Sequence, residues 1–205
     1  MLDVVIVNIS LAMDVDSVNT LFVPYGMPQQ RSTRARRIGL LTGTTTDTYT
    51  HLSTTAYLHW CERVGQAPVY EAYPAHDPCA GAVAADRLLA RPDRPDAVYG
   101  LFDPNGTDLL AAARRYGLRV PEDLLLVCCS ESAVYATTEP PITTLSLKPR
   151  RIGTAVVQLL IDAIEGVESD HPVEQVIPTE LIVRTSSERR SPRTTVSAPR
   201  GPEGG

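Results

Sequence analysis

A run of six apolar residues, from Leu124 to Cys129, is followed directly by Ser130 and Glu131. An uninterrupted apolar run of this length is typical of a strand that is buried on both faces of a parallel sheet. Parallel strands need long crossover connections, which are usually helices. The run therefore predicts an α/β fold, and its polar end marks the edge of the sheet where ligands bind in such folds.

The rest of the chain alternates strand and helix patterns in the same way. Short apolar runs that predict strands cover Ile38–Leu41, Val69–Tyr73, Ala97–Phe102, Ile142–Leu147 and about 175–184. Helical spacing between them predicts buried positions at Leu52, Ala56, Tyr57, Trp60, Cys61, Val64, Val83, Ala84, Leu88, Leu109, Leu110 and Ala113. The order favours a mainly parallel sheet with right-handed crossovers.

Glycine, proline and capping residues mark the ends of these helices. Gly65, Gly117 and Gly166 stand where a residue past the last helical turn belongs. Asp77 before Pro78 predicts one helix start, and Asn105 predicts another as a cap. A further helix is expected from Pro149, with an apolar stripe formed by Ile152, Val156, Leu159, Leu160 and Ala163.

Composition and motifs exclude several classes of function. The net charge of −5 provides no long-range attraction to nucleic acid. No apolar run approaches the length of a membrane span, so a cytoplasmic location without membrane contact is expected. The four cysteines form no C-x-x-C pair, and no metal or cofactor is predicted. The sequence lacks a nucleophile elbow, a P-loop and a G-x-G-x-x-G motif, so an enzyme is not expected.

Five segments in a fixed order resemble a known family. They are "RRIGLLTG", "RPDAVYGLFD", "GLRVPEDLLLVCCSE", "EPPITTLSLKPRRIGTAVVQLLIDAIEG" and "IPTELIVRTSS", within about residues 36 to 187. Together they are similar to the effector-binding region of the lactose/galactose repressor (LacI/GalR) family of bacterial transcription regulators. The segment "LDVVIVN" near the N-terminus resembles a strand of that family's first lobe.

The resemblance implies a two-lobed, periplasmic-binding-protein-like fold of type I, with a ligand cleft between the lobes and a homodimer. It implies a first-lobe remnant in residues 1–20 plus 149–170 and a second effector-binding lobe in 21–147 plus 172–187. The first lobe is expected to be incomplete. Residues 188–205 are expected to be a disordered tail because they cannot bury enough apolar surface to become ordered. DNA would be read only through a helix-turn-helix headpiece that we do not find in this chain.

The resemblance also implies the residues that line the cleft, and several depart from the family's pattern. His51 stands at a position that is commonly arginine, and Phe102-Asp103 replaces a common Asn-Asp pair. Ser130, followed by Glu131, stands where an aspartate usually grips sugar hydroxyls, and Leu147 replaces a residue that is often polar. We therefore expect ligand contacts at His51, Phe102, Asp103, Ser130, Glu131 and Leu147, with a carbohydrate-like effector that is less polyhydroxylated than usual.

Plainer interpretations of these residues stay open, as do two other functions. Asp103 could only start a turn, His51 could only begin a helix, and Phe102 could belong to the core. Ser130 and Glu131 could only satisfy backbone groups of their loop, while Tyr57 and Trp60 could be core or dimer residues. A solute-binding protein of a transporter would share the fold, and a non-functional remnant is the third possibility.

Overall fold

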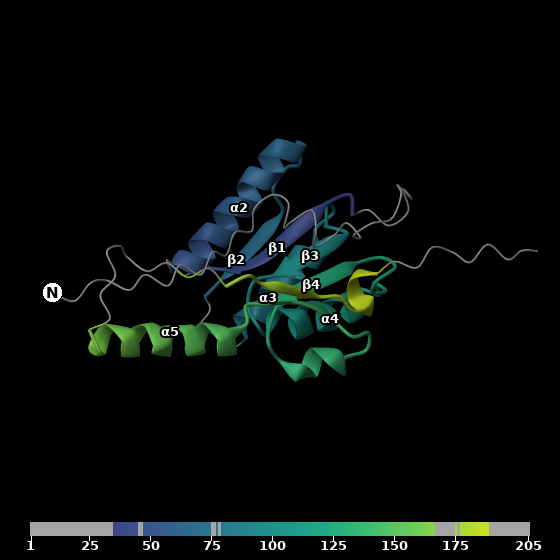
Figure 1. Cartoon of the computed structure of the whole chain (residues 1–205). Helices are drawn as coiled ribbons and strands as arrows, with labels where there is room; N and C mark the ends of the chain where they lie inside the picture. Colours follow the sequence, from purple (N-terminus) through teal and green to yellow (C-terminus); the bar gives the residue numbers. More distant parts are fainter. Residues whose placement is uncertain are drawn as a thin grey trace, which may run out of the picture.

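A single mainly parallel sheet organises the part of the chain that the computed structural model describes, which comprises residues 35–44, 47–74, 77, 79–166, 175 and 177–188. The sheet has the strand order β2-β1-β3-β4-β5-β6 (Figure 1). Its strands are β1 (Ile38–Gly43), β2 (Tyr70–Tyr73), β3 (Ala97–Gly100), β4 (Leu125–Cys129), β5 (Thr143–Ser146) and β6 (Glu180–Ile182). All pair in parallel except β6, which runs antiparallel to β5. The predicted α/β class with a mainly parallel sheet is confirmed.

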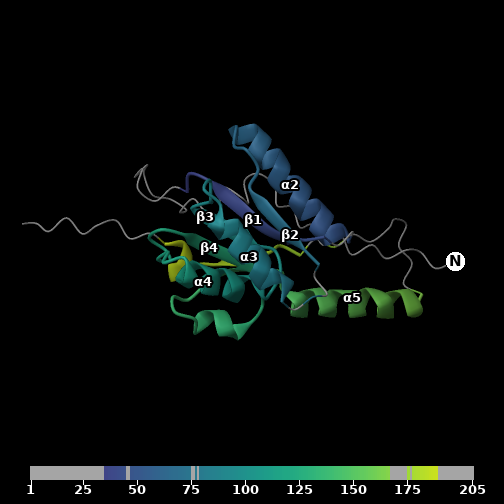
Figure 2. The same cartoon turned by 180° about the vertical axis from the view of Figure 1, so that it is seen from behind.

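Helices cover both faces of this sheet (Figures 1 and 2). Helix α2 (Thr48–Val64) covers one face, and helices α3 (Ala80–Ala90) and α4 (Asn105–Arg115) cover the other. The structure also contains helix α5 (Pro149–Ile164) and the short 3₁₀ turns η1 (Ala133–Ala136) and η2 (Thr185–Ser187). Successive strand residues point to opposite faces, so Leu126 and Cys128 join the core that contains α3 and α4. Leu125, Val127 and Cys129 join the core that contains α2. The run at 124–129 is therefore buried on both faces, as its composition predicts.

The helix ends follow the glycine signals closely. Gly65 and Gly117 adopt φ angles of 67° and 66°, and Gly166 adopts 71°. These left-handed conformations carry little steric cost for glycine, which has no Cβ atom. At Gly65 the amide donates to the carbonyls of the last helical turn of α2.

Two predicted helix starts are wrong in detail. The first helical residue of α3 is Ala80, so the helix begins after Pro78, and the Asp77 carboxylate accepts a hydrogen bond from the Cys79 amide at 2.9 Å. Asn105 is the first residue of α4 rather than its cap, and its side chain is fully buried. It accepts from the Phe102 amide at 2.9 Å and donates to the Tyr73 hydroxyl at 2.6 Å. Asn105 thus ties the turn after β3 to the end of β2.

Several residues predicted to be inward-facing are exposed. Leu52 and Val64 of α2 and Val83 of α3 are each about half exposed, whereas Tyr57, Trp60, Ala84 and Leu88 are buried. The helical pattern therefore includes the residues that form the buried face of each helix but makes that face too wide, because Leu52 and Val83 lie beside buried residues on the exposed side.

Helix α5 departs most from its predicted burial. In both views it projects away from the sheet (Figures 1 and 2). Of its residues only Ala155 is buried, and Val156 and Leu160 of the predicted stripe are 39% and 52% exposed. The described residues therefore do not cover the apolar side of α5. The division into a first-lobe remnant and a second lobe stays a prediction, and the expected segments before residue 35 and after residue 188 lie outside the described residues.

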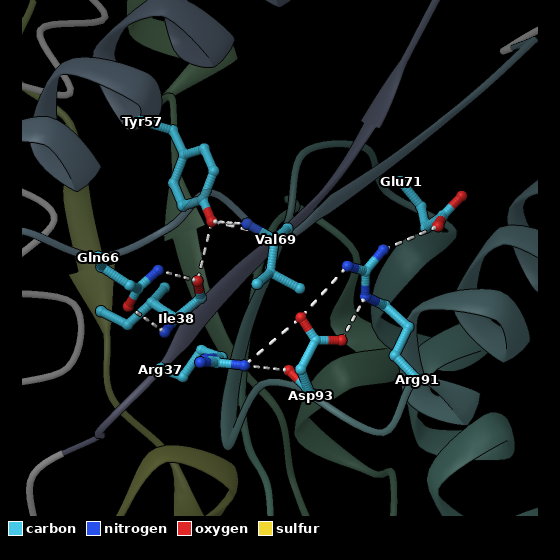
Figure 3. A network of polar contacts seen from close by, with 8 residues as sticks. All are labelled: Arg37, Ile38, Tyr57, Gln66, Val69, Glu71, Arg91 and Asp93. Carbon is cyan, nitrogen blue, oxygen red and sulfur yellow. Dashed lines mark hydrogen bonds and ion pairs between the residues drawn. The ribbon is translucent and has the colours of Figure 1, made fainter.

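A polar network at the amino end of the sheet fixes the start of β1 (Figure 3). The buried Tyr57 hydroxyl donates toward the Ile38 and Val69 carbonyls, at 2.9 and 3.1 Å, and accepts from the Val69 amide at 3.0 Å. The Gln66 amide group also bridges Ile38, since it donates to its carbonyl and accepts from its amide, each at 2.9 Å. Tyr57 therefore joins α2 to two strands with one oxygen atom.

Replacing Tyr57 with phenylalanine tests this network. The change leaves the buried Val69 amide without its partner, so we expect the free energy of unfolding to fall by about 1–3 kcal/mol. Urea denaturation followed by circular dichroism measures it. The matched control, Tyr116→Phe, removes an exposed hydroxyl and should shift stability by less than about 0.5 kcal/mol. Equal effects of the two changes would contradict the assigned role of Tyr57.

Candidate ligand site at the carboxyl edge of the sheet

The parallel register brings the residues after β3 and β4 together. Gly100 of β3 pairs with Cys128 of β4. Asp103 and Ser130 follow these two residues at the same edge of the sheet. The Ser130 hydroxyl donates a hydrogen bond to the Asp103 carboxylate and accepts one from the Ser132 amide at 2.9 Å. Ser130 is buried, whereas Asp103 is exposed.

A second hydroxyl holds the backbone of Asp103. The buried Tyr135 of η1 donates from its hydroxyl to the Asp103 carbonyl oxygen. Helix α4 can approach this ring because residue 106 is glycine, where a Cβ atom would lie 2.5 Å from the Tyr135 ring and 2.8 Å from the Cys128 sulfur. Side chain and backbone of Asp103 are therefore both fixed by the segment that follows β4.

Phe102 directly precedes Asp103 in the chain and carries an aromatic ring. It is half-buried and packs against both cores of the protein. Its ring centroid lies 6.2 Å from that of Tyr49 and 6.2 Å from that of Tyr73, in tilted and edge-on arrangements. The Tyr49 hydroxyl donates to the Leu101 carbonyl at 2.9 Å. Phe102 therefore packs in the core, as one interpretation of the sequence expected. Its contact with a ligand stays a prediction.

Glu131 and Lys148 connect the edge to the start of α5. A carboxylate oxygen of Glu131 lies 3.2 Å from the Lys148 amide, and the Lys148 ammonium pairs with the Glu180 carboxylate at 2.5 Å. Lys148 has a φ of 54°, the left-handed region that costs a side-chain-bearing residue energy. The hydrogen bond from the Lys148 ammonium lowers the pKa of Glu180. Glu131 thus bonds to the backbone directly before α5.

The remaining predicted site residues lie at the ends of neighbouring strands. His51 is in the first turn of α2, after β1, and is exposed. Leu147 follows β5, is half-buried, and packs against the core beneath α2. The six predicted residues therefore follow β1, β3, β4 and β5 at one edge. Direct contacts are found among some of them, and their contact with a ligand stays a prediction.

Sequence reasoning missed the residues that position this edge. Tyr135, Tyr49, Tyr73 and Asn105 were not predicted to act there, although each bonds or packs against the Phe102–Asp103 turn. Tyr49 lies in the first turn of α2, two residues before the predicted site residue His51, and this closeness is the signal by which it could have been found. For Tyr135 no local pattern exists, because its partner is 32 residues away.

The ionisable side chains near this edge include two buried thiols, Cys128 and Cys129. Among the described residues no group of three or more histidine, cysteine or acidic side chains could hold a metal ion. The nearby thiols are buried: burial raises the pKa of Cys128 to about 12, and burial also raises the pKa of Cys129. A thiol with a raised pKa is a poor nucleophile near neutral pH. No helix in the described part of the chain is long and apolar enough to cross a membrane.

Comparison with known proteins agrees with this arrangement. Residues 30–187 match the family described as periplasmic binding protein-like domain. The HTH-type transcriptional regulator CelR of Thermobifida fusca is 37% identical over 107 residues, which are 52% of this chain and 31% of CelR. The HTH-type transcriptional repressor CytR of Escherichia coli K12 is 30% identical over 154 residues, which are 74% of this chain and 45% of CytR. This chain therefore spans less than half the length of these relatives.

A solved structure described as a transcriptional regulator CelR–cellobiose complex is also similar. Its TM-score is 0.63 at 30% identity, over 74% of this chain and 47% of that one. The fold is thus that of a periplasmic-binding-protein-like domain. The chain belongs to this family, and it is the effector-binding region of a LacI-family regulator.

Thiol reactivity tests the described burial at this edge. Cys79 is exposed, whereas Cys61, Cys128 and Cys129 are buried. We expect one thiol per chain to react quickly with Ellman's reagent in the native protein, and the other three to react only on unfolding. The variant Cys79→Ser should lose the fast phase. A fast phase that persists in this variant would show that one of the three other thiols is accessible.

Proposed function

We propose that the chain is the sensor of a transcription regulator, and that it binds an uncharged or cationic carbohydrate-like effector at the carboxyl edge of its sheet. The observation that carries this proposal is the Asp103 carboxylate. It is exposed, yet hydroxyl groups from Ser130 and Tyr135 fix both its side chain and its backbone. A fixed carboxylate can accept charge-assisted hydrogen bonds from a ligand without paying for its own ordering.

The other predicted contacts have distinct roles in this proposal. Phe102 and Leu147 supply apolar surface for a ring face, while His51 and Glu131 supply polar groups at the rim. The Ser130 hydroxyl donates its single proton to Asp103, so Ser130 acts on a ligand through Asp103. It could offer a ligand only the acceptor lone pairs of its oxygen. The regulators named among the relatives support a role in transcription, a cytoplasmic location and the absence of enzymatic activity.

Binding of cellobiose, the ligand in the similar CelR complex, is the first test. Isothermal titration calorimetry should detect binding of cellobiose or of another member of a panel of mono- and disaccharides and nucleosides. The variant Asp103→Ala should weaken that binding by about 1.5–3 kcal/mol, roughly ten- to a hundredfold.

The matched control is Glu122→Ala, because Glu122 is an exposed carboxylate in the loop before β4, at the other end of that strand. It should leave the affinity unchanged. Unchanged affinity in Asp103→Ala would contradict the role of Asp103. The absence of binding by the whole panel at millimolar concentration would contradict the proposed effector class.

We also propose that the chain works as a homodimer. Strand β2 is an edge strand whose only sheet partner in the described part of the chain is β1, and its Tyr70 is 43% exposed. Exposed edges are common places for association. Light scattering at tens of micromolar is expected to give twice the mass of one chain, and a stable monomer would contradict this proposal.

A further inference from the structure

Helix α5 carries large apolar side chains on a side that the other described residues do not cover. Val157, Leu160 and Ile164 are 56%, 52% and 76% exposed. Their spacing of three and four residues places them on one side of the helix. Ile152 and Leu159, which have a similar spacing around the buried Ala155, lie on a different side and are half-buried. Apolar residues thus occupy two sides of α5, and the side of Val157, Leu160 and Ile164 lacks a partner among the described residues.

The order of residues on this exposed side is self-complementary. Gly153 lies on the same side as Val157, Leu160 and Ile164, and a Cβ atom at residue 153 would meet nothing within 4 Å outside its own helix. If two copies of α5 cross antiparallel, with the two-fold axis midway between Val157 and Leu160, then Val157 lies opposite the partner's Leu160. Gly153 then lies opposite the partner's Ile164, so the most exposed side chain meets the residue that has none. A two-fold symmetric contact requires this kind of reciprocity.

The charges at the two ends of α5 provide a second, independent observation. Arg150 and Arg151 stand at its amino end, whereas Asp162 and Glu165 stand at its carboxyl end. This order is the reverse of what the helix dipole favours, because the dipole stabilises acidic side chains at the amino end and basic ones at the carboxyl end. None of these four side chains forms an ion pair with another described residue. A partner outside the described residues with the opposite order of charge would compensate them.

We propose that α5 pairs antiparallel with α5 of a second copy of this chain. This inference deepens the homodimer proposed above by naming its surface, and it does not depend on the effector site. The apolar side supplies the buried area, while the charged ends set the direction. In an antiparallel pair the basic end of each helix lies beside the acidic end of the other, and the two dipoles oppose one another. A parallel pair would instead place like charges together at both ends.

The variant Leu160→Asp tests the apolar side of this contact. Analytical ultracentrifugation of the full unchanged chain at tens of micromolar should give a dimer. Leu160→Asp should weaken self-association by about a hundredfold or more, because a symmetric contact loses the apolar side chain twice. The matched control is Val83→Asp, which puts the same charge at a position of α3 that is also 52% exposed. It should leave the dimer intact, and thermal melts verify that both variants fold.

Two charge-reversed variants test the antiparallel direction. Arg150→Glu with Arg151→Glu makes both ends of α5 acidic, and Asp162→Lys with Glu165→Lys makes both ends basic. Each double variant alone should associate more weakly than the unchanged chain, most clearly at low salt, where charges are least screened. An equimolar mixture of the two should recover the dimer. Neither change opposes the helix dipole, so α5 itself should stay folded.

The outcomes separate this pairing from other partners of α5. Recovery on mixing requires contact between two chains, so failure to recover would overturn the antiparallel pairing. A dimer that withstands Leu160→Asp would also overturn it and would leave a homodimer through another surface, such as the edge of β2. A stable monomer of the unchanged chain would overturn both proposals. If that monomer also melted at a lower temperature after Leu160→Asp, a segment of the same chain would be the cover of α5.

Discussion

The parallel pairing of β3 with β4 determines where Asp103 and Ser130, the central pair of the proposed site, lie. The pairing of Gly100 with Cys128 sets the register. Because the strands are parallel, the segments that follow them leave the sheet at the same edge, and Asp103 comes to lie beside Ser130. A shift of one residue would move each side chain of β4 to the opposite face, so both cores would have to repack. The burial of Leu124 to Cys129 therefore fixes the geometry of the edge as well as the stability of the sheet.

Much of the fold could be predicted because it follows from local patterns. Apolar runs locate the strands, and the glycines at 65, 117 and 166 locate three helix ends to within about two residues. The failures have physical causes too. Val83 fits a helical stripe but is half exposed, although Ala84 next to it is buried. Asn105 resembles a cap, although its side chain bonds to Tyr73, which is 32 residues away. A sequence pattern reports which side of an element is apolar, whereas burial also depends on what covers that side, as α5 shows.

Some features of the site could likewise be predicted from the local sequence, whereas others depend on residues that are distant in the chain. That polar residues would follow β1, β3 and β4 could be predicted from the strands themselves, and the family resemblance pointed to Asp103 and Ser130. The hydrogen bond between them could not be predicted, because it depends on the register of two strands and on the side-chain conformations of both residues. It gives an account of the serine at a position where a carboxylate is common: the hydroxyl orients Asp103, whereas a second carboxylate there would repel it.

The central claim is that an effector binds at the carboxyl edge of the sheet, and amide chemical-shift mapping tests it most directly. Titration of the labelled protein with the sugar that binds in calorimetry should shift the amides of Phe102, Asp103 and the residues that follow Ser130. Amides at the opposite edge, such as those of Ile38 and Val69, should remain in place. Shifts concentrated at that opposite edge, with the Asp103 region unchanged, would contradict the claim.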